Sequence, residues 1–228
     1  MKPYQTIPIQ DCREPLVSIP LEQFSVEMPH PYEKLGAFYG EKSPYYLRAK
    51  VVDALIEAQT YLQQQCPGWK IHIFDAYRPV TVQQFMVDYT FASLLREKGL
   101  ILEQLSPPQQ QSLWQQVYQI WAIPSENPAT PPPHSTGAAV DITLIDDQAQ
   151  LLDMGGMIDE LSERSQPNYY SQSRDGTERA YDQRRELLNE IMSQMGFLRH
   201  PGEWWHFSLG DQMWAWQSKT AIAHYGRV

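Results

Sequence analysis

The sequence predicts an α+β fold in which helices pack around a small, mainly antiparallel sheet. Apolar residues recur at three- and four-residue steps in several long segments, which is the period of helices buried on one face. Two short segments, 70–75 and 139–145, instead alternate along the chain as strands do. No internal repeat or domain-scale linker interrupts this pattern, so residues 1–228 are expected to form a single domain.

The first third of the chain is predicted to contain a helix, a strand and a loop. Residues 43–66 follow a helical period, with S-P at the start and C-P-G at the end. The segment K-I-H-I-F-D at 70–75 alternates its isoleucines with other side chains, which indicates a short strand. The loop D-A-Y-R-P follows and carries Arg78.

Two further helices are predicted in the middle of the chain, followed by a long loop. Residues 81–98 keep a helical period, and Gly99 is typical of a helix C-terminus. Another helix begins at Ser106, since a serine followed by proline favours a helix start. Five prolines in the eleven residues 123–133 exclude a helix or a central strand. This segment is therefore predicted to be an ordered loop that leads to His134.

The last third of the chain is predicted to contain a strand, a loop, a helix and a final strand. In A-V-D-I-T-L-I at 139–145, aliphatic residues occupy every second position, which places Asp141 on the opposite face of the strand. Residues 163–180 are polar and aperiodic, as in a surface loop that can border a site. Residues 185–195 return to a helical period, and E-W-W-H-F-S-L at 203–209 is interpreted as the last strand.

Composition excludes several classes of function. A formal net charge of -9 and a pI near 5.1 come without any run of Lys and Arg, so no nucleic-acid partner is expected. No segment approaches the roughly 18 to 20 apolar residues of a membrane span, so no membrane partner is expected either. The N-terminal residues hold no apolar run of the signal-peptide kind, which predicts a cytoplasmic location. The sequence carries no signal for an oligomeric state.

The two cysteines are not expected to bind a metal. Cys12 and Cys66 lie far apart in sequence and away from the histidine motifs described next. A disulfide between them is left open as an alternative, although a reducing compartment disfavours it.

Two short motifs together contain the groups of a hydrolytic metal centre. H-S-T-G-A-A-V-D offers His134 and Asp141, and E-W-W-H offers Glu203 and His206. A catalytic zinc has three protein ligands and an open position for water, and a nearby free carboxylate can accept a proton from that water. Two histidines and Asp141 are therefore candidate ligands, with Glu203 as the candidate base. Imidazole ligands argue against magnesium and calcium, which prefer oxygen.

These residues also have ordinary structural interpretations. A histidine in a loop, such as His134, is more often a surface residue than a ligand. Glu203 and His206 are three positions apart and would face opposite sides of an ideal strand. If Pro201-Gly202 forms a turn, however, Glu203 lies outside the strand and both side chains can reach one site.

Four more residues near these motifs bear on the site. Gly137 indicates a tight turn between the first histidine and its strand. Trp204 and Trp205 either fill a core or form an indole wall that excludes water from a metal. Arg78 is either a surface or ion-paired residue, or a guanidinium that stabilises an oxyanion. The remaining histidines are interpreted as structural: His30, His72, His200 and His224.

Four motifs occur in a defined order: D-A-Y-R-P, H-x-x-G-x-A-x-D, D-M-G and E-x-W-H. With their surroundings they span residues 39–207, which is most of the chain. In this combination the sequence resembles the D-alanyl-D-alanine dipeptidases, which are zinc enzymes of peptidase family M15 with the Hedgehog/D,D-peptidase fold. The resemblance implies a hydrolase that carries one zinc ion per chain and splits the small D,D-dipeptide D-Ala-D-Ala into two D-alanines.

The resemblance also implies roles for individual residues. His134, Asp141 and His206 are expected to bind zinc. Glu203 is expected to be the general base, and Arg78 to stabilise the transition state and contact the substrate.

Further substrate contacts are implied for Asp159 and Trp204. Asp159 looks like the family's acidic residue that pairs with the free ammonium group of a dipeptide. The family often has a serine two residues before the first zinc histidine, where it helps to bind substrate, and this chain has Pro132 there. Because proline has no hydroxyl group, that contact must be absent or come from another residue.

Two other functions are left open by the sequence. A D,D-carboxypeptidase acting on longer peptidoglycan peptides would use the same chemistry, but a carboxylate placed for a free N-terminus, such as Asp159, favours short substrates. A non-catalytic zinc-bearing binding module of the same fold would keep the three ligands, and it would not need Glu203 and Arg78 together.

Overall fold

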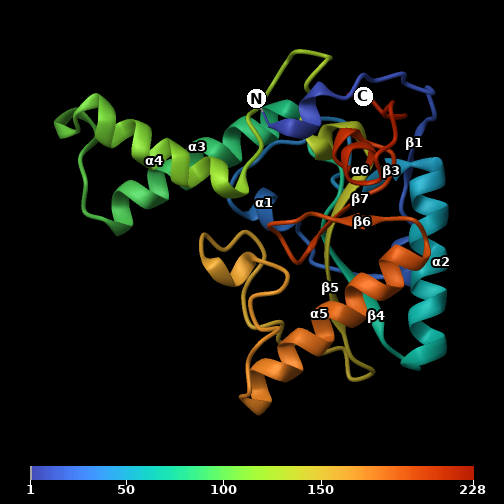
Figure 1. Cartoon of the computed structure of the whole chain (residues 1–228). Helices are drawn as coiled ribbons and strands as arrows, with labels where there is room; N and C mark the ends of the chain where they lie inside the picture. Colours follow the sequence, from blue (N-terminus) through green and yellow to red (C-terminus); the bar gives the residue numbers. More distant parts are fainter. Residues whose placement is uncertain (1) are drawn as a thin grey trace.

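A five-stranded sheet runs through the middle of the molecule, with the strand order β2-β4-β5-β7-β6 (Figure 1). The computed structural model describes residues 2–228. The strands are β2 (Ser25–Val26), β4 (Lys70–Asp75), β5 (Ala139–Ile145), β6 (Leu198–Arg199) and β7 (His206–Ser208). β2 is parallel to β4, and the other neighbouring strands are antiparallel. The predicted α+β fold with a mainly antiparallel sheet is confirmed.

One face of the sheet is covered by two helices, α2 (Ala49–Gln65) and α5 (Gly176–Gln194), which lie beside β4 and β5 in Figure 1. The aliphatic residues that alternate along β4 and β5 are fully buried in this layer: Ile71, Ile73, Val140, Ile142 and Leu144. They share one core with Leu55 of α2 and Leu188 of α5. Because side chains alternate along a strand, Asp141 faces the other side of the sheet.

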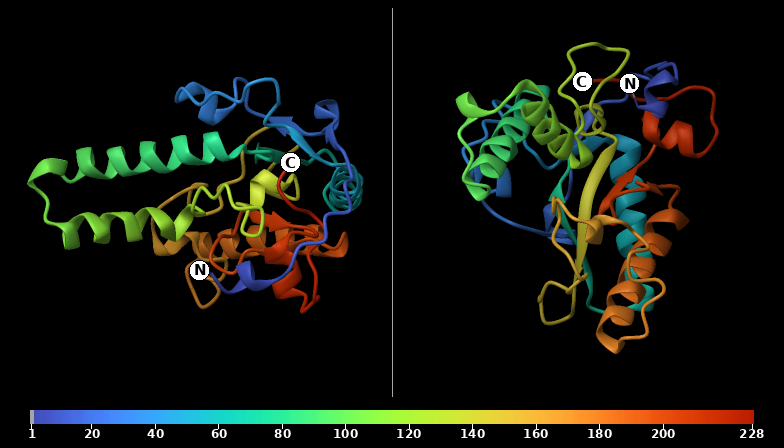
Figure 2. Two further views of the ribbon diagram at one scale, coloured as in Figure 1. Left: turned by 90° about the horizontal axis from the view of Figure 1, so that it is seen from above. Right: turned by 60° about the vertical axis from the view of Figure 1, so that its left-hand side comes forward.

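Helices α3 (Val80–Glu97) and α4 (Pro107–Ile120) form a hairpin that projects from the body of the molecule (Figure 2). The hairpin has an apolar cluster of its own, in which the rings of Phe91 and Trp114 stack with centroids 3.9 Å apart. Its first helix directly follows the D-A-Y-R-P loop. The base of the hairpin therefore borders the region of the predicted site.

Shorter elements surround the ends of the sheet. β1 (Leu16–Ser18) pairs with β3 (Tyr46–Arg48), and α1 (Pro31–Lys34) lies between β2 and β3 in sequence. The last helix, α6 (Gln212–Gln217), contacts the 3₁₀ helix η1 (Pro3–Thr6), so the two ends of the chain pack together. The other 3₁₀ helices are η2 (Leu21–Gln23), η3 (Leu102–Gln104), η4 (Pro133–Thr136) and η5 (Glu163–Ser165).

Two predicted helix starts are wrong. The helix predicted from residue 43 begins at Ala49, because Tyr46–Arg48 pair with β1 as a strand. The helix predicted from residue 185 begins at Gly176. Asp175 accepts hydrogen bonds from two backbone N–H groups of the first turn, so a cap stabilises a start that the polar sequence conceals.

The last strand is shorter than predicted, since β7 starts at His206 and the residues before it form a turn and a bend. The turn at Pro201-Gly202 therefore exists, and Glu203 lies outside the strand. The predicted elements 70–75, 81–98 and 139–145 agree within one residue at each end, and the helix predicted from Ser106 begins at Pro107. Both cysteines are free. Within residues 2–228, no helix combines the length and apolar character needed to cross a membrane.

Candidate metal centre

Two of the predicted ligands, Asp141 and His206, are direct neighbours across the sheet. In the antiparallel pairing of β5 with β7, Asp141 lies opposite His206. Residues paired in this way have Cβ atoms about 4.5–5.5 Å apart and point to the same face. The backbone ladder thus brings together two side chains that are remote in sequence.

The third predicted ligand, His134, reaches the same place through a tight turn. It lies in η4, after which Gly137 leads the chain into β5 with a left-handed φ of 70°. A Cβ atom at Gly137 would come 2.3 Å from Leu16 Cδ2, so a larger residue would force its neighbour to move. The predicted turn between His134 and Asp141 is confirmed.

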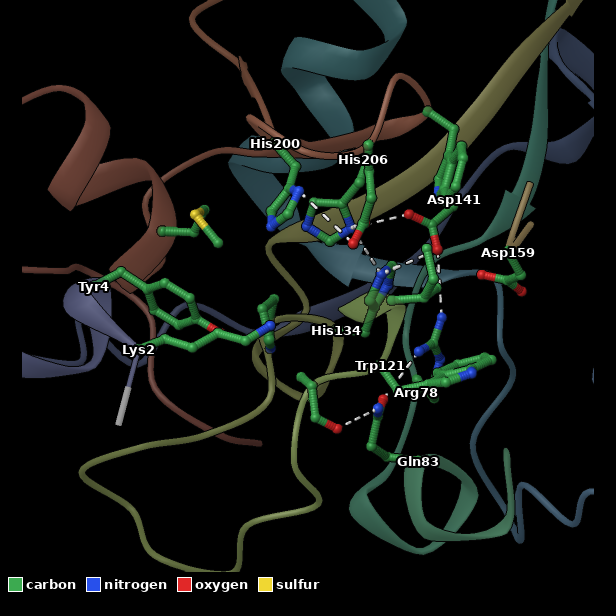
Figure 3. Close-up of a pocket in the computed structure, with 16 residues that line it drawn as sticks. Lys2, Tyr4, Arg78, Gln83, Trp121, His134, Asp141, Asp159, His200 and His206 are labelled. Atoms are coloured by element: carbon green, nitrogen blue, oxygen red, sulfur yellow. Dashed lines mark hydrogen bonds and ion pairs between the residues drawn. The ribbon is translucent and has the colours of Figure 1, made fainter. Parts of the chain in front are cut away.

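The side chains of His134, Asp141 and His206 converge on one point (Figure 3). His134 Nε2 lies 3.2 Å from Asp141 Oδ2 and 3.2 Å from His206 Nδ1. His206 Nδ1 lies 2.9 Å from Asp141 Oδ1. Bonds of about 2.0–2.1 Å to a tetrahedral zinc separate two ligand atoms by about 3.3 Å. The three side chains therefore fit one small divalent cation.

Each imidazole is oriented by a second contact. His134 Nδ1 donates to the carbonyl oxygen of Ala76 at 2.7 Å, which leaves Nε2 free to bind a metal. On the other ring, His206 Nε2 lies 3.4 Å from the hydroxyl of Ser208, which itself donates to Asp211. These contacts select Nε2 of His134 and Nδ1 of His206 as the ligand atoms.

The charges in the cluster are coupled. Burial opposes the ionisation of Asp141, but the imidazoles of His134 and His206 hold the pKa of Asp141 well below its usual range. Burial also opposes the charged form of His134, yet the adjacent carboxylate of Asp141 raises the pKa of His134. Each of the three side chains is at most 5% exposed, so these interactions are poorly screened by water.

Glu203 lies beside the cluster without being part of it. Its Oε2 is 3.9 Å from His206 Nδ1, and its Oε1 is 3.7 Å from His200 Nδ1. Burial and, to a smaller extent, the negative charge of Asp141 raise the pKa of Glu203 well above its usual value. The carboxyl group is thus within reach of a water molecule at the cluster, and it needs a nearby positive charge to ionise.

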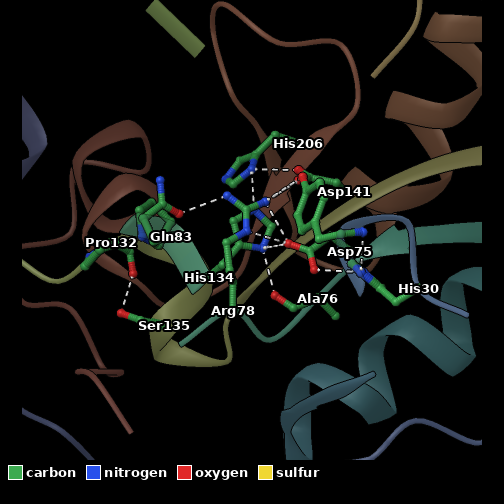
Figure 4. Close-up of polar contacts among 12 residues, drawn as sticks. His30, Asp75, Ala76, Arg78, Gln83, Pro132, His134, Ser135, Asp141 and His206 are labelled. Atoms are coloured by element: carbon green, nitrogen blue, oxygen red, sulfur yellow. Dashed lines mark hydrogen bonds and ion pairs between the residues drawn. The ribbon is translucent and has the colours of Figure 1, made fainter. Parts of the chain in front are cut away.

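Arg78 is fixed next to the cluster by contacts on all three nitrogens (Figure 4). Nε donates to Asp75 at 2.8 Å, and Nη1 donates to Gln83 at 2.9 Å. Nη2 donates to the hydroxyl of Tyr32 at 3.2 Å and lies 3.3 Å from Asp141 Oδ2. Burial alone would lower the pKa of Arg78, but these partners raise it well above its usual value, so the guanidinium stays charged.

Asp75 is a site residue that the sequence pattern did not reveal. It pairs with Asp141 in the β4–β5 ladder, and its Oδ1 lies 3.1 Å from Nε2 of the buried His30. Burial opposes its ionisation, but Arg78 and then His30 lower the pKa of Asp75. The one feature of the sequence that could have indicated Asp75 is its position three residues before Arg78 in D-A-Y-R-P. His30 thus contacts this carboxylate and lies outside the cluster of proposed ligands.

Asp159 lies at the edge of the same pocket, on the loop between β5 and η5. Its backbone has a left-handed φ of 63°, and the hydroxyl of Tyr32 donates to its carboxylate at 2.6 Å. Burial, followed by the charge of Asp141, raises the pKa of Asp159 to about 6. Because the Tyr32 hydroxyl also accepts from Arg78, one side chain connects Asp159 to the guanidinium.

The two tryptophans lie in different places. Trp205 lines the pocket that contains the cluster, whereas Trp204 lines a separate cavity. The bend before β7 separates them, since Trp204 N–H donates to the carbonyl of Ser165 and Trp205 O accepts from Ile142 N–H. The geometry therefore gives no support to the prediction that Trp204 contacts the substrate, because Trp205 and not Trp204 lines the pocket that contains the cluster.

The N-terminal segment closes one side of the pocket. Lys2 and Tyr4 line it on the side away from Asp159 (Figure 3). The free volume is about 30 Å³, roughly the share of one water molecule in the liquid. Nothing in the local sequence marks Lys2 or Tyr4 as part of a site.

Relatives of the chain share one description. The sequence pattern of the D-ala-D-ala dipeptidase family matches residues 25–224. A D-alanyl-D-alanine dipeptidase of Synechocystis sp. is 55% identical over 240 residues, which cover 100% of this chain and 97% of that protein. Another, from Escherichia coli, is 33% identical over 145 residues, which cover 64% of this chain and 58% of that protein. Among solved structures, the zinc-bound vancomycin resistance D,D-pentapeptidase VanY matches with a TM-score of 0.45 and 15% identity, covering 90% of this chain and 87% of that one.

Proposed function

The chain belongs to the D-alanyl-D-alanine dipeptidase family of metallopeptidases, and from this premise we propose that it hydrolyses D-Ala-D-Ala to two D-alanines with a single zinc ion. The observation that carries the proposal is the convergence of His134, Asp141 and His206, whose ligand atoms all lie within 4.8 Å of one another. Two imidazoles and one carboxylate form a ligand set that suits zinc in hydrolases. Glu203, which lies outside that set, is the proposed general base.

When bound at these ligands, zinc would polarise the peptide carbonyl and acidify water in the pocket. Glu203 takes a proton from the attacking water, because a positive charge beside it offsets the effect of burial and favours the carboxylate. Glu203 then passes this proton to the nitrogen of the leaving amine as the peptide bond breaks. One D-alanine leaves with the new carboxylate and the other with the new amino group.

Arg78 is the proposed stabiliser of the oxyanion. Gln83 accepts from Nη1, which carries two hydrogens. The second Nη1 hydrogen has no acceptor within residues 2–228 and can reach a substrate oxygen in the pocket. The other contacts hold the guanidinium in place before substrate binds, so little reorganisation accompanies the reaction.

Asp159 is the proposed partner of the free ammonium group of the substrate. A longer peptide would present a neutral amide there and leave a buried carboxylate without a cation, which costs free energy. This cost favours a dipeptide over the longer substrates of a D,D-carboxypeptidase.

A binding module without catalysis is disfavoured by the presence of Glu203 and Arg78 beside the cluster, since neither would be needed to hold an ion. The proposal includes a cytoplasmic location, which rests on the sequence alone.

The proposal is tested by incubating the zinc-loaded protein with three dipeptides. We expect D-alanine to be released from D-Ala-D-Ala, and no cleavage of L-Ala-L-Ala or of N-acetyl-D-Ala-D-Ala, whose blocked amine cannot pair with Asp159. Metal analysis should find one zinc per chain. Comparable cleavage of the acetylated peptide would favour a carboxypeptidase, and a fully zinc-loaded protein that cleaves none of the three would exclude a dipeptidase.

A further inference from the structure

The side of the pocket opposite Asp159 is formed by the N-terminal segment. Lys2 and Tyr4 both line the pocket, and Figure 3 shows their side chains pointing toward the metal cluster from the side away from Asp159. The segment is held in place because η1 packs on α6 and the carbonyl oxygen of Ile7 accepts a hydrogen bond from Gln212. A substrate at the cluster would therefore lie between Asp159 and this segment.

Lys2 is the pocket cation that remains available for a ligand. Besides histidines, the pocket is lined by two basic side chains, Arg78 and Lys2. Arg78 is already paired with Asp75 and Asp141. No ion pair within residues 2–228 involves Lys2, whereas Lys34 pairs with Glu27. The Lys2 ammonium group can thus bind a carboxylate of a ligand without breaking an existing ion pair.

Tyr4 adds a neutral donor next to Lys2. Its side chain is only 5% exposed, and within the described residues its hydroxyl has no hydrogen-bond partner. Burial, followed by the charges of Asp211 and Glu203, raises the pKa of Tyr4, so the phenol keeps its proton. An ammonium and a phenol side by side suit an anionic oxygen pair.

The segment that delivers His134 cannot supply such donors. Pro132 and Pro133 have neither a backbone N–H nor a side-chain donor. The hydroxyl of Ser135 is used within its own turn, since it donates to the carbonyl of Pro132 at 2.7 Å. A carboxylate bound on this side of the cluster must therefore find its partners on another element.

We propose that the Lys2 ammonium, assisted by the Tyr4 hydroxyl, binds the free C-terminal carboxylate of the dipeptide substrate. This inference rests on the proposed function and assigns the second end of the substrate. Asp159 holds the ammonium end, Lys2 holds the carboxylate end, and the peptide bond lies between them at the cluster. The contact takes the place of the hydroxyl that Pro132 lacks, and it selects against any peptide whose C-terminus is blocked or continues.

The test compares D-Ala-D-Ala with D-Ala-D-alaninamide, in which a neutral amide replaces the carboxylate. For Lys2→Met, kcat/KM for D-Ala-D-Ala should fall about 10- to 100-fold, mainly through KM, because a charge-assisted contact is lost. The value for the amide should stay within about twofold, since that substrate never made the contact. Lys2→Arg should restore most of the loss, and Lys50→Met, at an exposed position outside the pocket, should behave as wild type.

A binding measurement makes the result independent of turnover. In the zinc-loaded Glu203→Gln protein, calorimetry should show that Lys2→Met weakens D-Ala-D-Ala and leaves the amide unchanged. Equal losses for both ligands, or no loss for either, would overturn the assignment of Lys2. Failure of the dipeptidase itself would be seen differently, as absence of D-alanine release by the wild-type protein, so the two failures can be told apart.

Discussion

The proposed metal ligands and the groups proposed to recognise substrate are held by different kinds of structure. Asp141 and His206 occupy facing positions on adjacent strands, so the register of the sheet determines their distance. Asp159 and Lys2 lie outside helices and strands and depend on a few local contacts. The reacting centre therefore follows from the scaffold, whereas the choice of substrate depends on irregular segments that the scaffold carries.

Arg185 of α5 is the main attachment of the Asp159 loop. Its Nε donates to the carbonyl of Met154 at 2.7 Å and its Nη1 to that of Gln166 at 3.0 Å, so one side chain holds both ends of the loop. The guanidinium lies over the ring of Trp204 at 5.2 Å and is fully buried. Burial lowers the pKa of Arg185 to about 10, which still leaves it charged at neutral pH. The recognition loop is thus anchored to a helix rather than to the sheet.

The largest effect is expected from removing a ligand that the sheet positions. His206→Ala should abolish zinc binding and, with it, all turnover of D-Ala-D-Ala, because two protein ligands do not hold a catalytic zinc. Metal content after dialysis and D-alanine release are the measurements. His224→Ala, which changes an exposed histidine, is the matched control. A variant that kept both zinc and activity would remove His206 from the ligand set.

Glu203→Gln, also at the reacting centre, should abolish most of the turnover without affecting metal binding. We expect kcat to fall about 10³-fold, because the amide cannot accept a proton from water. Zinc content should remain at one per chain, since Glu203 lies outside the ligand set. Glu190→Gln, at an exposed position on α5, controls for loss of a charge. Loss of zinc without loss of turnover would reverse the assignment.

Asp159→Asn should show the opposite pattern to a ligand variant. KM for D-Ala-D-Ala should rise about 10- to 100-fold, as expected for loss of one charged hydrogen bond. Zinc content should not change, because the loop carries no ligand. Steady-state kinetics beside the exposed Asp147→Asn variant provide the measurement and its control. Loss of zinc in this variant would show that the Asp159 loop also affects metal binding, against the separation of the two regions.

The pH dependence of KM reports on the same carboxyl group. Its pKa is raised to about 6 by burial and by Asp141, so Asp159 takes up a proton as the pH falls through about 6. Protonation removes the negative charge that attracts the substrate ammonium, and KM should then rise up to about tenfold per pH unit. The rise should be absent in Asp159→Asn. A wild-type KM that is flat between pH 7 and about pH 5 would contradict this role.

The smallest effect is expected from loosening the attachment of the loop. Arg185→Met should raise KM about threefold, because Asp159 would be held less accurately, while zinc content stays unchanged. Arg179→Met, an exposed substitution on the same helix, should leave KM unaltered. Kinetics and metal analysis on both variants decide whether α5 positions the substrate site.

The local geometry of the proposed ligands could be predicted from the sequence because its signals are local. Asp141 sits in an alternating strand, Gly137 marks the turn, and Pro201-Gly202 marks the bend that places Glu203 beside His206. The pairing of β5 with β7 has no local signal, and it could be inferred only by assuming that Asp141 and His206 bind the same ion. The contacts among them then follow from that pairing.

The recognition side was harder to predict because its contacts join residues that are remote in sequence. Asp159 entered through the family resemblance, whereas Tyr32, which donates to it, has no local motif. Lys2 and Tyr4 come from a segment whose position depends on packing against α6. Trp205 and not Trp204 lines the pocket because both residues lie in a bend, where the alternation of side chains along a strand does not apply.

The facing positions of Asp141 and His206 also bear on how such a protein can diversify. Lengthening or replacing the long connection between β5 and β7 leaves both side chains on the same rung, provided that the two strands keep their register. Insertion of one residue inside β5 would instead turn the following side chains to the opposite face. The connecting segments can therefore change during evolution and alter which peptides bind, while the two strands keep the proposed ligands in the same relative positions.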